Sequence, residues 1–107
     1  MKLPDVIKVG PYDFVIEEWT PRMAAANERY GECSCQELTI RIDSSLVPIK
    51  MADTLLHELL HAVWWVWGID DGDNEERTVH KLAIGLTAVW RDNPGLLDWF
   101  DAQTSDG

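Results

Sequence analysis

Residues 48–68 read PIKMADTLLHELLHAVWWVWG, and this stretch decides the fold. Its leucine, alanine, valine and tryptophan side chains would surround most of the circumference of a helix over residues 49–67. A helix that is apolar all round is a buried one. Pro48 suits the entry to a helix, and Gly68 can adopt the left-handed conformation that often follows a helix end. The stretch therefore predicts a buried helix against which the remaining chain must pack.

Two strand patterns precede this helix. Residues 6–19 form two runs rich in β-branched and aromatic side chains around the turn signal Gly10-Pro11, which predicts a hairpin. Residues 37–43 (ELTIRID) alternate strictly between polar and apolar, which predicts a strand. Its core-facing side chains would be Leu38, Ile40 and Ile42, and its solvent- or cleft-facing side chains Thr39, Arg41 and Asp43. The segment between, residues 22–35, is ambiguous, with a helical turn favoured near its start.

A second helix is predicted after the first. Residues 70–74 (DDGDN) read as a turn whose Asp or Asn can cap a helix over 75–91. Residues 93–95 (NPG) would stop it, and 96–100 would add one last turn before a frayed polar end. The expected fold is α+β: a small, mostly antiparallel sheet packed on two principal helices. The chain's 107 residues fit a single domain, 1–107.

The composition argues against some partners. The chain carries 19 acidic against 9 basic residues, a net charge of −10. Such a surface repels phosphate backbones and anionic lipid, so neither a nucleic-acid nor a membrane partner is expected. No apolar run is long enough to span a bilayer, and residues 1–5 lack the apolar core of a signal peptide. We therefore expect a cytoplasmic location.

Cys33 and Cys35 form a Cys-x-Cys pair. A disulfide closing so small a ring would be strained. In a strand both thiols would point to the same face, where they could bind a metal. A pair without two further ligands nearby is weak support for a metal site, so two reduced thiols are the favoured interpretation.

The chemistry lies in HELLH at residues 57–61, an H-E-x-x-H sequence in the middle of the first helix. His57 and His61 are one helical turn apart, so both imidazoles can reach one tetrahedral zinc ion. Glu58 projects to the side of the metal, where a carboxylate can take a proton from metal-bound water. Buried polar groups are costly unless something satisfies them, and a metal would satisfy all three.

An open zinc site needs a third protein ligand. The second helix offers Glu75, Glu76 and His80, and periodicity alone does not choose among them. If the helices pack antiparallel, the site would lie where they meet, beside the 37–43 strand.

The arrangement resembles the minimal gluzincin metallopeptidases, in particular the short ImmA/IrrE-like and phage-encoded proteins. The resemblance spans residues 36–95 and includes a second motif of the form E-x-x-[AV]-x-x-[FL]-A, matched by ERTVHKLA at 76–83. It implies that Glu76 is the third zinc ligand, with Glu75 as the fallback. It also implies that an extended peptide adds to the edge strand of the sheet.

His80, Tyr12 and Tyr30 are further candidates for the site. His80 departs from the acidic residue that several gluzincins carry there; a role in orienting a ligand is favoured over direct ligation. Such enzymes often stabilise the oxyanion with a Tyr or His. Nothing places Tyr12 or Tyr30 in that role, and the tryptophans are expected mainly in the core.

We therefore expect a zinc metallo-endopeptidase that acts on a protein or peptide, in the host cytoplasm if the chain is phage-encoded. One rival is a non-catalytic zinc-bearing interaction module, such as a phage or prophage accessory protein. Another is a metal-free structural protein. Iron, manganese or cobalt would also suit the ligands, and the oligomeric state is open.

Overall fold

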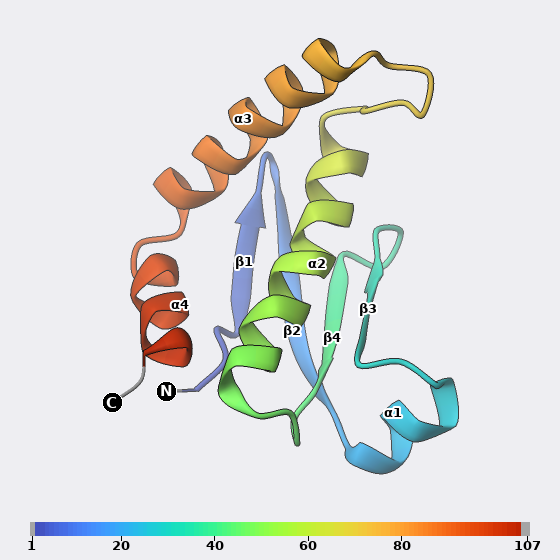
Figure 1. The fold of residues 1–107 in the computed structure, drawn as a ribbon, viewed down its shortest axis with the longest axis vertical. Coiled ribbons are helices and arrows are strands. Elements are labelled where there is room, and N and C mark those ends of the chain that lie inside the picture. Colours follow the sequence, from blue (N-terminus) through green and yellow to red (C-terminus); the bar gives the residue numbers. More distant parts are fainter. Residues whose placement is uncertain (1, 106–107) are drawn as a thin grey trace.

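The computed structural model describes residues 2–105, which form an α+β fold of four strands and four helices (Figure 1). The strands are β1 (Val6–Val9), β2 (Tyr12–Trp19), β3 (Gly31–Ser34) and β4 (Thr39–Asp43). The helices are α1 (Pro21–Asn27), α2 (Pro48–Val66), α3 (Glu75–Asp92) and α4 (Leu96–Thr104). Among these residues, no helix combines the length and the apolarity needed to cross a membrane.

The sheet has the strand order β1-β2-β4-β3. The pairs β1–β2 and β3–β4 are antiparallel, whereas β2 and β4 run parallel. The sheet is therefore mixed but mostly antiparallel, as predicted. The predicted hairpin over residues 6–19 is present, with Gly10 in the left-handed region at its turn. The strand predicted over 37–43 is an inner strand, and the edge strand beside it is β3, from the ambiguous segment.

Strand β4 is shorter than predicted because it begins at Thr39. Leu38 has a φ of 53°, so it belongs to the turn between β3 and β4 and its side chain reaches the core from there. Ile40 and Ile42 are fully buried, as predicted. Thr39 was expected to face solvent or a cleft, but it is buried. Asp43, for which the same was expected, is also largely buried, yet it does line a hollow beside α1. Its carboxylate accepts hydrogen bonds from the backbone and hydroxyl groups of Ser45, at 2.9 and 2.7 Å.

Helix α2 lies across the sheet, as Figure 1 shows, and supplies the centre of the core. Its sheet-facing side is fully buried against β1, β2 and β4. The prediction that this helix is buried all round is wrong, because its outer side reaches solvent. Leu60 and Trp65 are 36% and 45% exposed. The buried core residues of α2 are Ala52, Leu55, Leu59, Ala62 and Val63.

Helix α3 begins where it was predicted, and the Asn74 side chain caps it by accepting a hydrogen bond from the Arg77 backbone at 2.9 Å. It contacts α2 through its middle, at Gly85. A Cβ added to Gly85 would lie 2.6 Å from Val63 and 3.1 Å from Trp67, so only glycine permits this close crossing. The first turn of α3 therefore extends beyond the end of α2 (Figure 1).

The chain ends in a helix longer than the single turn expected. Helix α4 continues to Thr104, so residues 101–104, predicted to be frayed, are helical. Leu96 and Trp99 are buried, and α4 packs on α2. This packing accompanies an extension of the helix into the polar residues 101–104, for which the sequence predicted no helix.

Candidate metal centre

The H-E-x-x-H residues converge on one side of α2. Ligand atoms of His57, Glu58 and His61 all lie within 4.8 Å of one another. The two imidazole rings meet edge to face, with centroids 5.1 Å apart. A zinc ion holds nitrogen ligands at about 2.0 Å, which places two tetrahedral ligands about 3.3 Å apart. Small side-chain rotations can therefore bring both histidines onto one ion, and the donor set suits zinc.

The three side chains differ in burial. Glu58 is only 7% exposed, whereas both histidines are exposed to solvent. The expectation that all three are buried is therefore wrong, because the histidines lie toward the open side of α2. Burial raises the pKa of Glu58 above its usual value, while positive charge on His57, His61 or Arg29 opposes the rise. A carboxylate with a raised pKa is a better proton acceptor than an ordinary glutamate.

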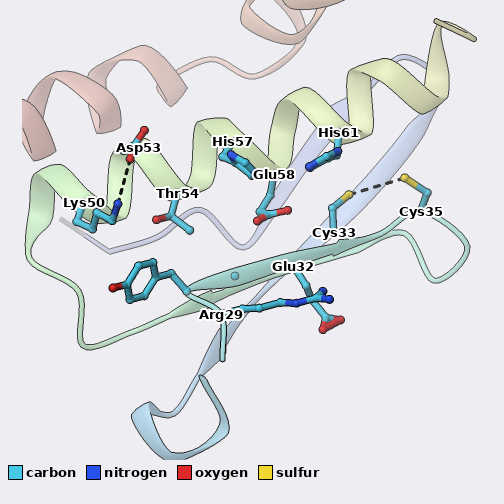
Figure 2. Close-up of a pocket in the computed structure, with 12 residues that line it drawn as sticks. Arg29, Glu32, Cys33, Cys35, Lys50, Asp53, Thr54, His57, Glu58 and His61 are labelled. Carbon is cyan, nitrogen blue, oxygen red and sulfur yellow. Dashed lines mark hydrogen bonds and ion pairs between the residues drawn. The ribbon is translucent and has the colours of Figure 1, made fainter. Parts of the chain in front are cut away.

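The cluster faces a cleft of about 650 Å³ between α2 and the segment that leads into and through β3 (Figure 2). In Figure 2 the Glu58 carboxylate points from α2 toward β3. The lining side of α2 is mostly polar, and the facing wall carries an arginine, a tyrosine, a glutamate and two thiols. The lining residues are Arg29, Tyr30, Gly31, Glu32, Cys33, Cys35, Lys50, Asp53, Thr54, His57, Glu58 and His61.

Gly31 explains why β3 can lie so close to α2. A Cβ at this position would come 2.7 Å from the backbone oxygen of Arg41 and 3.0 Å from the methyl group of Thr54. No real Cβ occupies such a space without a shift of the strand. Glycine at the start of β3 therefore sets the width of the cleft. Because side chains alternate along a strand, residue 33 lies on the same face of β3 as residue 31.

Cys33 and Cys35 both line the cleft, and their sulfur atoms are 3.8 Å apart. In Figure 2 both thiols lie on the β3 side of the cleft, across from α2. Burial, the charge and hydrogen bond of Cys35, and the negative charges of Glu58 and Glu32 raise the pKa of the Cys33 thiol. The Cys-x-Cys spacing could not predict this position, because no local sequence pattern indicates that β3 faces the H-E-x-x-H helix.

The predicted residues of α3 are not part of this cleft. Glu75, Glu76 and His80 are exposed, and none of them lines it. The expectation that the site lies where the two helices meet is therefore wrong: the site lies between α2 and β3. The reason is the crossing at Gly85, which holds the first turn of α3 past the end of α2. The assignment of Glu76 as a ligand, with Glu75 as its fallback, stays a prediction.

The two tyrosines occupy different places. Tyr30 lines the cleft, with the Lys50 ammonium 5.2 Å from its ring centroid. Tyr12 packs instead against Trp65, with ring centroids 5.4 Å apart, and does not line the cleft. Arg29, which the sequence did not single out, also lines the cleft beside Glu58. Of the two tyrosines considered for an oxyanion, only Tyr30 lies at this site.

No protein-family model, curated protein or solved structure matches the chain. The resemblance to the minimal gluzincins therefore remains a prediction from the two motifs.

Proposed function

We propose that this protein is a zinc-dependent metallo-endopeptidase. The observation that carries the proposal is the convergence of His57, Glu58 and His61 on an open cleft. Two imidazoles at this spacing suit a tetrahedral ion, and a buried carboxylate between them suits proton transfer. The resemblance to the gluzincins agrees with this chemistry.

In this proposal His57 and His61 hold the metal. When bound, zinc supplies Lewis-acid activation of water and polarises a carbonyl oxygen. Glu58 accepts a proton from the attacking water and passes it to the leaving amine nitrogen. Its burial supports this role, because a raised pKa brings a carboxyl group closer to the working pH of a general base. Arg29 or Tyr30 would stabilise the developing oxyanion, since both line the cleft.

The substrate would be an extended polypeptide. Strand β3 is an edge strand and forms one wall of the cleft, so its free backbone groups offer a template for β-addition. A peptide paired there would run alongside α2 and bring a backbone carbonyl to the cluster.

Glu58→Gln tests the role of the base. We predict that the variant keeps its zinc but loses cleavage of a random peptide library by about 10²- to 10⁴-fold, the usual contribution of a positioned general base. The matched control is Glu18→Gln on β2, an exposed glutamate outside the cleft, which should cleave like the wild type. Cleavage by zinc-loaded Glu58→Gln at the wild-type rate would rule out this mechanism.

The second candidate is a zinc-bearing interaction module without turnover. The observation in its favour is the set of large apolar side chains exposed on α2 and α3. Trp65, Val79 and Ile84 are each about half exposed, at 45%, 54% and 47%. If the wild-type protein binds zinc but cleaves nothing in the library, this second function is the better one.

A further inference from the structure

We propose that Cys33 on β3 is a metal ligand that joins His57 and His61 to complete a three-residue zinc site. This inference rests on the metal site proposed above, and it differs from the ligand set that the resemblance implies. It assigns the third ligand to the sheet rather than to α3.

The first support is position. Cys33 lines the same cleft as the two histidines, on the wall that faces them. Its sulfur lies on the β3 side of the cleft, toward α2, in Figure 2. The close approach of β3 to α2 at Gly31 keeps this wall near the cluster. Among the described residues only His57, Glu58 and His61 already have ligand atoms within 4.8 Å of one another, so the Cys33 sulfur must move toward the histidines to share an ion with them.

The second support comes from the other donors that line the cleft. The Glu32 carboxylate accepts a hydrogen bond from Arg41 at 3.1 Å. Asp53 is exposed and pairs with Lys50 at 3.5 Å, at the far end of the cleft in Figure 2. Within the part of the chain that the structure describes, the two thiols pair with no charged group and hydrogen-bond only with each other, at 3.8 Å. A thiolate is also the softer donor, which zinc favours over a surface carboxylate.

The chemistry of the thiol is consistent with this role. A zinc ion bound here would take the Cys33 sulfur as a thiolate, because a coordinating thiol loses its proton outright. The Cys35 sulfur lies 3.8 Å from that of Cys33, within reach of an S–H hydrogen bond between the two. Two histidines and one cysteine leave one position open, as in catalytic zinc sites.

Cobalt(II) in place of zinc provides the test, because a cobalt–thiolate bond produces a charge-transfer band in the near ultraviolet. We expect the cobalt-loaded protein to show this band together with the visible bands of a tetrahedral ion. Cys33→Ser and Cys33→Ala should lose the charge-transfer band. Cys35→Ser, the matched thiol control, and Glu76→Gln should both keep it. Circular dichroism of each variant checks that the fold is intact.

The outcomes separate the two proposals. If cobalt binds with visible bands but no charge-transfer band, or if the band survives in Cys33→Ser, the assignment of Cys33 is overturned while the metal site stands. If Glu76→Gln loses the visible bands, Glu76 is the third ligand and the assignment of Cys33 is overturned. If cobalt does not bind at all, the proposed function fails together with this inference.

Discussion

Glu58 and the histidines beside it occupy adjacent positions on α2 but have different surroundings. The carboxyl group is buried against β3, and the imidazoles face the open side of the helix. A metal on the histidines would thus be reached from solvent, while the base beside it stays shielded. Exposed histidines beside a buried glutamate suit a site in which a substrate reaches the metal while the general base is kept from bulk water.

Asn93 is the residue that ties the end of α3 to the sheet. Its side chain accepts a hydrogen bond from the Lys8 backbone at 2.7 Å. It also donates to the backbone oxygens of Lys8 and Val89, at 2.8 and 2.7 Å. We predict that Asn93→Ala lowers the free energy of unfolding by about 2–3 kcal/mol, because partly buried backbone groups lose their partners. Urea unfolding measures this change.

The matched control is Asn27→Ala. Asn27 is exposed, and its side chain makes one hydrogen bond, to the Met23 oxygen of the same helix. Asn27→Ala should lower the free energy of unfolding by less than about 1 kcal/mol. Equal losses in the two variants would contradict the role given to Asn93.

At the residue scale, much of the site could be predicted from the sequence. His57, Glu58 and His61 lie within one helical turn, so their convergence depends on local geometry alone. The exposure of the histidines could not be predicted, because it depends on which side of α2 the sheet covers. The position of Cys33 opposite the cluster depends on strand pairing across the sheet, which no local pattern reports.

Among the elements, β3 has the largest influence on the site. It is an edge strand of four residues, held by pairing with β4 and by contact with α2. Its sequence, GECS, has neither the length nor the apolar alternation that predicts a strand, so it could only be recognised in the folded sheet. In contrast, the helix over 48–66 has a long periodic pattern with clear end signals, and its bounds were predicted to within one residue at each end.

Gly31→Ala tests the packing of β3 on α2. An added Cβ would meet the Arg41 backbone oxygen and Thr54, so the strand must shift. We predict a loss of about 1–3 kcal/mol in the free energy of unfolding, typical of overpacking. Weaker zinc binding should accompany it if Cys33 is a ligand. Gly72→Ala is the control, since the nearest heavy atom would be 3.7 Å away. If Gly31→Ala is as stable as Gly72→Ala, the close packing of β3 on α2 is contradicted.

For the whole molecule, the general architecture was predictable and the relative placement of its helices was not. A hairpin, an alternating strand and two long helical patterns indicate an α+β fold, which the structure confirms. The crossing of α3 over α2 depends on Gly85, where one missing Cβ lets Val63 and Trp67 approach. Nothing in the periodicity of α3 favours that contact over one through its first turn. The prediction that Glu76 lies beside the histidines depended on where α3 crosses α2.

A metal would also matter for the stability of so small a chain. A domain of about 100 residues buries a limited core, and metal binding to the folded state adds directly to its stability. Zinc at a free concentration about 100 times its dissociation constant would add about 2.7 kcal/mol. For a domain of this size that corresponds to a rise in melting temperature on the order of 10 °C.

The most direct measurement is the metal content of the protein, purified without a polyhistidine tag or chelator and analysed by elemental mass spectrometry. We predict about one zinc per chain, as a single-ion site requires. The metal should be lost in the His57→Ala/His61→Ala double variant, and the melting temperature of the wild type should fall when a chelator removes it. A protein that contains no metal, and whose melting temperature does not change when zinc is added, would contradict the metal site at His57 and His61.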